Sequence, residues 1–238
     1  EGIRDLLFWD NNLTQDHENI HGRCEEMIRR RLSVIWSGNT RCDTLDLKTA
    51  KLMKRAGCWK VLIGFESGVQ KNIDALHKGE TLDMYEEAMA NCRQAGLREF
   101  ATFIFGIPGE TFQDGLQTIE FAKKLNADYT KFFTMGVHPG TEMWKHLDRF
   151  GTCFGGDSQA HLNAGFVPHT MTRSELAGLL DRANRSFYMR PAYLLKKLAT
   201  MRNLEDARQN LRGFQAFSRA GLQRARQTPD PTPGAPTP

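Results

Sequence analysis

Five short loops in the sequence combine glycine with polar or charged side chains, and each follows an apolar run. They are WDNNLT (9–14), WSGNTR (36–41), GFESG (64–68), FGIPGET (105–111) and GVHPGT (136–141). In the fourth loop, Gly106 and Gly109 allow backbone N–H groups to approach a ligand closely, and Pro108 favours an extended path. A single loop of this kind is better explained as an ordinary strand-to-helix turn. Five in series favour a rim that binds a small polar molecule.

The apolar runs before these loops are rich in β-branched and aromatic residues and recur at intervals of roughly thirty residues, or forty in one case, close to the size of a βα unit. They are IRDLLFW (3–9), LSVIW (32–36), WKVLIGF (59–65), EFATFIF (99–105) and YTKFFTM (129–135). Near-continuous apolar strands are typical of a parallel sheet that is buried on both faces. A doubly wound sheet and a (βα) barrel both fit this pattern, and both gather the carboxyl ends of their strands at one rim.

The segments between the predicted strands have helical periodicity. Residues 82–96 place apolar side chains on one face and end on Gly96, a good helix stop. Residues 112–125 do the same, and Thr111 is placed to cap that helix. The predicted core positions of the two helices are Leu82, Tyr85, Ala88 or Met89, and Cys92, and then Phe112, Leu116, Ile119 and Ala122.

The composition is that of a soluble globular chain, with 40% hydrophobic and 25% charged residues among 238. No run approaches the roughly 18 apolar residues of a membrane helix, and the opening EGIRDLLFWD does not resemble a signal peptide. We therefore expect no membrane span and a cytoplasmic location. The cysteines are an odd number and none lies within four residues of another, which argues against disulfides and against a local metal site. They are Cys24, Cys42, Cys58, Cys92 and Cys153.

The run from RCDTLDLKTAKL (41–52) through IGFESGVQKNI (63–73) to FATFIFGIPGET (100–111) closely resembles the core of radical SAM enzymes, especially the branch that often carries a cobalamin-binding domain. The likeness extends from FWDNNLT to HPGTEMW and more weakly beyond. It implies an α/β fold, a partial (βα) barrel of parallel strands with its first strand missing, over residues 1–150. C-terminal helices would follow over 151–226, and a Pro-rich disordered tail over 227–238.

The same resemblance implies a binding site for S-adenosylmethionine. Asp10 and Asn12 would meet its amino group, and Arg41 its carboxylate. Gly64 and Glu66 of the IGFESG segment would bind the ribose, with Glu66 accepting hydrogen bonds from its hydroxyls, because two carboxylate oxygens suit two vicinal hydroxyls. The adenine-binding segment of the family corresponds to Ile104, Gly106 and Glu110 here. No residue is assigned a catalytic or metal-binding role.

Each of three assignments has a simpler alternative. Asp10 either binds the cofactor or caps a turn. Glu66 either binds ribose or caps the following helix. Arg41 either pairs with the ligand or bridges to Asp43 or Asp46.

One departure from the family pattern is decisive for chemistry. Radical SAM enzymes hold a [4Fe-4S] cluster with three thiolates spaced C-x3-C-x2-C, and this sequence has no such motif. The motif belongs after the first strand, so we expect the chain to be a fragment whose parent carries the cluster. The parent would cleave S-adenosylmethionine reductively to begin radical chemistry on an unknown small molecule. It would use a donor such as flavodoxin or ferredoxin and, in some members of this branch, cobalamin.

Two other functions remain open. Residues 171–226 hold 12 Lys and Arg against 4 Asp and Glu, a balance that suits an RNA-binding or RNA-modifying module. The aromatic residues there fall at helical core spacing rather than between the arginines, so nucleic-acid binding is disfavoured. A cluster-free (βα) barrel enzyme that acts on a phosphorylated small molecule is the second alternative.

Overall fold

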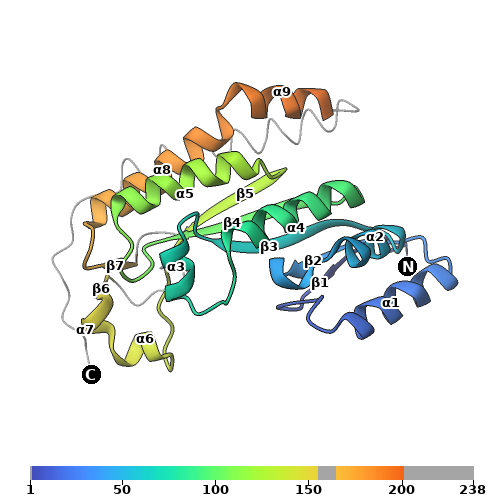
Figure 1. The fold of residues 1–238 in the computed structure, drawn as a ribbon, viewed down its shortest axis with the longest axis horizontal. Coiled ribbons are helices and arrows are strands. Elements are labelled where there is room, and N and C mark those ends of the chain that lie inside the picture. The colour runs from blue at the N-terminus through green and yellow to red at the C-terminus, as the bar shows by residue number, and fades with distance from the viewer. Residues whose placement is uncertain (1, 155–164, 201–238) are drawn as a thin grey trace.

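Five parallel strands form one sheet in the computed structural model, which describes residues 2–154 and 165–200. The strands are β1 (Asp5–Phe8), β2 (Ile35–Thr40), β3 (Cys58–Glu66), β4 (Arg98–Phe105) and β5 (Tyr129–Thr134). They lie side by side in chain order, and every neighbouring pair is parallel (Figure 1). A doubly wound sheet would reverse its strand order at a switch point, so the unbroken order confirms the partial (βα) barrel.

Helices connect each strand to the next. They are α1 (His17–Arg29), the 3-10 turn η1 (Cys42–Thr44), α2 (Leu47–Arg55), α3 (Gln70–Ala75), α4 (Leu82–Ala95) and α5 (Phe112–Leu125). Two of the predicted helix boundaries are confirmed. Thr111 caps α5 in a capping box with Asp114, and Gly96 ends α4 at φ +74°, a conformation that glycine adopts without steric cost.

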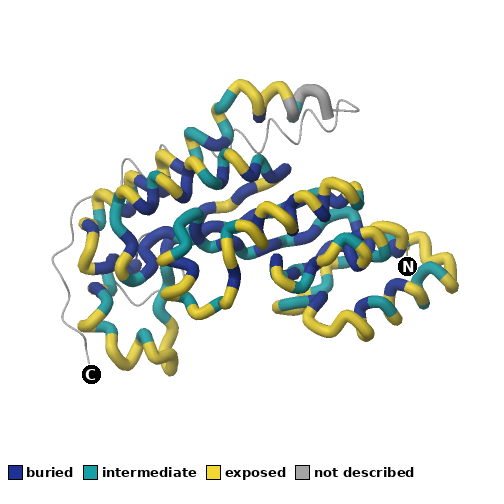
Figure 2. Tube along the Cα trace, in the orientation of Figure 1, coloured by how far each residue is buried: buried dark blue, intermediate teal, exposed yellow. Residues whose placement is uncertain are grey.

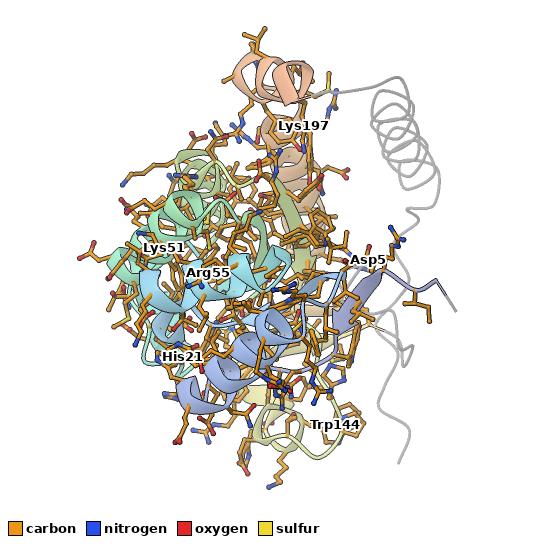
Figure 3. All side chains as sticks on the ribbon, turned by 90° about the vertical axis from the view of Figure 1, so that its right-hand side faces the viewer. Asp5, His21, Lys51, Arg55, Trp144 and Lys197 are labelled. Atoms are coloured by element: carbon orange, nitrogen blue, oxygen red, sulfur yellow. The ribbon has the colours of Figure 1, made fainter. Side chains whose placement is uncertain are left out.

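The two faces of the sheet differ in burial. In β3, Val61, Ile63 and Phe65 are buried, whereas the alternate residues are half-buried (Figure 2). Side chains alternate across a strand, so one face lies under helices and the other forms the more open inner face of the partial barrel. The far sides of the helices are exposed, as at Lys51 and Arg55 of α2 (Figure 3).

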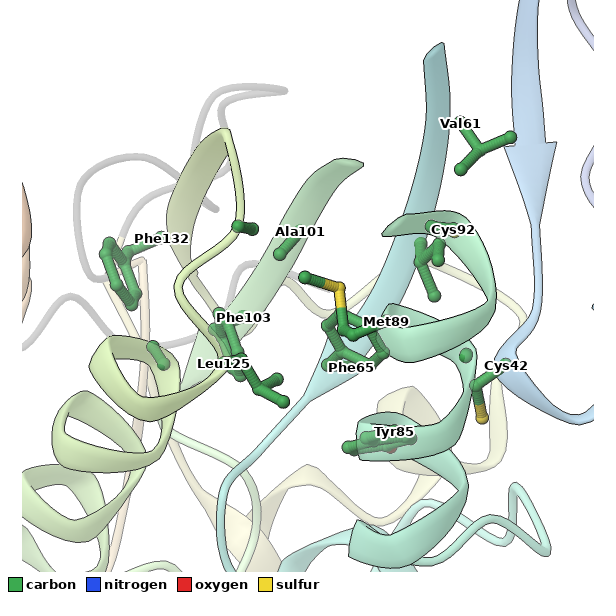
Figure 4. Packing of buried hydrophobic residues seen from close by; sticks show 14 of the residues in the cluster. Cys42, Val61, Phe65, Tyr85, Met89, Cys92, Ala101, Phe103, Leu125 and Phe132 are labelled. Atoms are coloured by element: carbon green, nitrogen blue, oxygen red, sulfur yellow. The ribbon is translucent and has the colours of Figure 1, made fainter. Parts of the chain in front are cut away.

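The core fills the space between the sheet and its helices. Phe65 of β3 lies 6.0 Å from Phe103 of β4 and 4.7 Å from Tyr85 of α4, measured between ring centroids. All three rings are fully buried, and Met89 and Leu125 pack around them (Figure 4). Aromatic pairs at these separations add to the free energy of burial, so the core fixes α4 against the strands that end at the rim.

The second strand is where the sequence prediction was wrong. LSVIW was expected to be the strand and WSGNTR the loop, but β2 runs from Ile35 to Thr40, and Arg31 turns the chain at φ +53°. Gly38 and Asn39 have low strand propensity, which hid the strand. Tertiary packing decides here, because a Cβ on Gly38 would lie 3.0 Å from Leu13 Cδ2.

The chain continues beyond the sheet through short elements and two longer helices. These elements are α6 (Glu142–Lys145), α7 (Leu147–Phe150), β6 (Gly151–Cys153), β7 (Phe166–Pro168), α8 (Arg173–Tyr188) and α9 (Pro191–Thr200). A capping box of Thr172 and Glu175 begins α8, which packs against α5 and β5 and shares the main core through Leu179 and Phe187. The predicted helices beyond residue 200 and the tail at 227–238 lie outside the described residues. The domain boundary near residue 150 stays a prediction.

No helix among the described residues is long and apolar enough to span a membrane.

Candidate functional site

The loops that follow the five strands lie along one edge of the sheet, because all five strands point the same way. This edge, here called the rim, carries all of the predicted site residues. A separate groove of about 740 Å³ between α5 and α8 contains none of them. The rim is therefore the place where the predicted chemistry must be tested.

Glu66 occupies the end of β3 in an unusual backbone conformation. Its φ is +58°, in the left-handed region that costs a side-chain-bearing residue roughly 1 to 2 kcal/mol. The pairing of β3 with β4 shifts register between Gly64 and Glu66, and the carboxylate folds back over Gly64. A Cβ on Gly64 would lie 2.4 Å from Glu66 Oε1, so glycine leaves the room that the carboxylate takes. Strain of this kind is concentrated at functional sites.

The carboxylate of Glu66 contacts a lysine that no sequence motif singled out. Lys78 Nζ donates to Glu66 Oε1 at 3.0 Å and to the carbonyl of Gly64 at 2.8 Å. The Glu66 side chain is 17% exposed, so it is neither sealed in the core nor turned out into bulk water. The first residue of α3 is Gln70 and its N-cap is Val69, with no side-chain cap. Glu66 therefore does not cap that helix, and the alternative role is excluded.

Arg41 is engaged by the protein itself. Its guanidinium donates to both carboxylate oxygens of Asp43, at 3.0 and 2.7 Å, and to the carbonyl of Lys78 at 2.7 Å. It also lies 3.1 Å from Glu80 Oε1, an ion pair without hydrogen-bond geometry. The bond from Arg41 lowers the pKa of Asp43 despite partial burial. The structure thus shows the guanidinium of Arg41 bridged to Asp43, with its paired N–H groups used there.

Asp10 and Asn12 form the corner between β1 and α1. Asp10 Oδ1 accepts from the backbone N–H of Asn12 at 3.2 Å, which is the turn-capping alternative. Asn12 Oδ1 accepts from the backbone N–H of Arg41 at 3.3 Å and from the hydroxyls of Thr14 and Thr44. These bonds tie the tips of β1 and β2 together. Both residues lie at the rim as predicted, and their contact with a ligand stays a prediction.

The FGIPGET loop is built around a buried carboxylate. Glu110 Oε2 accepts the backbone N–H groups of Gly106 at 2.5 Å and Ile107 at 3.1 Å, and the residue is fully buried. Gly106 and Gly109 have φ of +85° and +82°, which explains why glycine stands at both. Glu110 therefore shapes the loop from inside instead of lining a pocket, which corrects its predicted position. Ile104 is half-buried on the inner face of β4, and Gly106 follows the end of that strand.

The burial of Glu110 predicts a pH-dependent stability. Burial raises its pKa to about 7 from 4.5, although the N–H groups of Gly106 and Ile107 act in the opposite direction. The folded chain then binds the proton of the Glu110 carboxyl more tightly than the unfolded chain does. Protonation of Glu110 therefore adds fully to the free energy of unfolding below pH about 4.5, and this stabilisation is lost as the pH rises through about 7. The Glu110→Gln variant cannot titrate here. Between pH 5 and pH 8, urea unfolding should show wild type losing about 2 kcal/mol relative to the variant. Equal pH slopes for the two proteins would contradict this expectation.

Other rim residues were missed by sequence reasoning. Ser67 is fully buried and bonds Thr118 of α5 at 3.1 Å, while Asn72 donates to Ser67 Oγ at 3.1 Å. Gly68 donates to Thr118 at 3.0 Å, and a Cβ on Gly68 would lie 2.4 Å from Phe121 Cβ. The contacts with Thr118 and Phe121 fix the end of β3 against α5. They join residues about fifty positions apart in the chain, so no local motif signals them.

The described cysteines do not fit an iron–sulfur cluster. Cys24, Cys42, Cys58 and Cys92 are buried and lie on separate elements, and burial raises the pKa of Cys24 to about 11 and of Cys58 to about 12. Within the described ranges, the only close group of possible metal ligands is Cys42, Asp43 and Glu80, which contains one thiol. Arg41 and Lys78 already pair with its carboxylates. The part of the chain that the structure describes therefore lacks the three converging thiolates that such a cluster needs.

The comparisons with known proteins agree with the arrangement of the sheet and rim. Residues 14–122 match the family model of the radical SAM superfamily. An uncharacterised methyltransferase of Pyrococcus horikoshii is 29% identical over 199 residues, covering 83% of this chain and 43% of that protein. The anaerobic magnesium-protoporphyrin IX monomethyl ester cyclase of Rubrivivax gelatinosus is 26% identical over 220 residues, covering 89% of this chain and 39% of that protein. The chain thus spans about two fifths of the length of these relatives.

A solved structure shares the fold. The methyltransferase TsrM of Kitasatospora setae, with cobalamin and a [4Fe-4S] cluster bound, superposes with a TM-score of 0.57 at 21% identity. The match covers 76% of this chain and 38% of TsrM. At this level of identity the likeness shows the fold alone.

Proposed function

We propose that the chain is a member of the radical SAM superfamily and that it forms the wall that binds the nucleoside part of S-adenosylmethionine in a radical enzyme. When bound at a reduced iron–sulfur cluster, this cofactor supplies radical chemistry to the enzymes of the superfamily. The residues of this chain would bind and orient the cofactor. Thiolates for the cluster would come from outside the described residues.

The observation that carries the proposal is the placement of Glu66. Its carboxylate lies at the end of a central strand, in a strained backbone, with room provided by Gly64. A partly exposed carboxylate with one oxygen held by an ammonium can accept a hydrogen bond from a ribose hydroxyl on the other oxygen, and charged hydrogen bonds are about twice as strong as neutral ones. The Gly106–Gly109 loop lies at the end of the neighbouring strand, where its backbone would contact adenine.

The substrate can be proposed only as a broad class. We propose a small-molecule substrate held over the inner face of the sheet, with methyl transfer or ring closure as the reaction, in line with the names of the two relatives. Cobalamin as a second cofactor, and flavodoxin or ferredoxin as electron donor, belong to the same proposal for the whole protein. So does a cytoplasmic location.

The test is binding of S-adenosylhomocysteine to the full 238-residue chain by isothermal titration calorimetry. We expect a Kd of about 0.1 to 1 mM, since the cluster would normally hold the amino acid end of the ligand. Glycerol 3-phosphate serves as the probe for the phosphate-ester alternative and should not bind. Saturable binding of glycerol 3-phosphate, with none of S-adenosylhomocysteine up to about 5 mM, would overturn the proposal.

A further inference from the structure

Lys78 lies in the loop between α3 and α4, and its ammonium has three acceptors. Nζ contacts the Gly64 carbonyl at 2.8 Å, Glu80 Oε2 at 2.9 Å and Glu66 Oε1 at 3.0 Å. The side chain is 16% exposed. The contacts with Gly64 and Glu66 are hydrogen bonds, and the contact with Glu80 is an ion pair. Lys78 therefore acts on its protein neighbours.

Neighbouring elements hold Lys78 in this position. Glu80 is fully buried, accepts a hydrogen bond from the Tyr85 hydroxyl of α4 at 3.0 Å, and pairs with Arg41 at 3.1 Å. Arg41, which follows β2, also donates to the Lys78 carbonyl at 2.7 Å. A buried carboxylate needs such partners, because an unpaired charge in the interior is strongly destabilising. The ammonium is thus anchored independently of Glu66.

Because Lys78 is held in this way, the two carboxylate oxygens of Glu66 differ in their contacts. Oε1 is held by Lys78, whereas Oε2 makes no hydrogen bond or ion pair to any described residue. Among the described residues, Lys78 is the only hydrogen-bond or ion-pair partner of this carboxylate. Lys78 fixes that direction and leaves one oxygen available.

We infer that Lys78 is a positioning residue that aims Glu66 at a ribose hydroxyl, and so determines the preference of the rim for ribonucleosides over deoxyribonucleosides. The inference rests on the proposed function, in which Glu66 binds ribose. Without the ammonium, the carboxylate would turn toward water, and the ligand would have to order it on binding. Discrimination between hydroxylated and deoxy ligands should then be lost along with affinity.

The experiment compares adenosine with 2′-deoxyadenosine and 3′-deoxyadenosine as probes, by calorimetry on the full chain. Lys78→Met alone would leave Glu80 with fewer partners and endanger folding, so the informative pair is the single variant Glu80→Gln and the double variant Lys78→Met with Glu80→Gln. Lys51→Met, at an exposed position of α2, controls for loss of a lysine charge. Thermal unfolding checks that each variant is folded.

Wild type and Lys51→Met should prefer adenosine over at least one deoxy analogue by about tenfold or more. Glu80→Gln loses the ion pair to Lys78 but keeps the bonds from Lys78 to Gly64 and Glu66, so it should discriminate more than the double variant, for which less than about threefold is expected. Equal discrimination in Glu80→Gln and in the double variant would overturn the role of Lys78 while leaving the proposed function intact. Failure of wild type to bind either adenosine or S-adenosylhomocysteine would overturn the proposed function, and the inference with it.

Discussion

Replacing Glu66 by alanine is expected to weaken S-adenosylhomocysteine binding by about 10- to 100-fold. A hydrogen bond to a charged group contributes about 1.5 to 3 kcal/mol, and the change removes the only carboxylate that we assign to the ribose. The effect should be in affinity and not in folding, because alanine at φ +58° carries the same kind of backbone strain as glutamate. Calorimetry with S-adenosylhomocysteine measures the first quantity, and urea unfolding the second.

The matched control is Glu87→Ala, which removes an exposed carboxylate from α4. Its affinity should stay within about twofold of wild type, roughly 0.4 kcal/mol. Glu66→Gln keeps the shape and one acceptor and should fall between wild type and alanine. If Glu66→Ala binds as tightly as Glu87→Ala, the carboxylate does not contact the ligand and the site assignment is wrong.

The largest loss of stability is expected from Phe103→Ala. Phe103 of β4 is fully buried on the helix-covered face of the sheet. Its ring is stacked on that of Phe132 at 5.7 Å and tilted against that of Phe65 at 6.0 Å. Removing such a ring leaves a cavity and should lower the free energy of unfolding by about 3 to 5 kcal/mol. Urea unfolding at constant pH measures this change.

The control for Phe103 lies on the same strand. Phe100 is half-buried on the inner face, stacked 6.3 Å from Tyr129. Phe100→Ala should cost about 1 kcal/mol, because part of its ring already meets solvent. Similar losses for the two variants would mean that helices do not cover the face on which Phe103 lies.

The sequence alone determined the elements and their order. The stop at Gly96 and the caps at Thr111 and Thr172 were predictable because each depends on residues within three or four positions. Four of the five strands were located by apolar runs, and the parallel arrangement followed from their near-continuous character. The bounds of β2 could not be predicted from the sequence, because Gly38 and Asn39 owe their strand conformation to neighbours on β1 and β3.

Only the tertiary structure decided what each rim residue does. The sequence left Arg41 either to the ligand or to a bridge with Asp43 or Asp46, and in the structure it bonds Asp43 and also reaches Glu80, thirty-nine positions later. Glu110 was predicted to line the pocket, yet its carboxylate points back to the N–H groups of its own loop. Lys78 received no role, because its three acceptors meet only when the chain folds. A residue type and its spacing reveal which chemistry is available at the rim. The direction in which a side chain points depends on contacts between elements distant in the sequence, and for the Glu66 carboxylate that direction is set by Lys78.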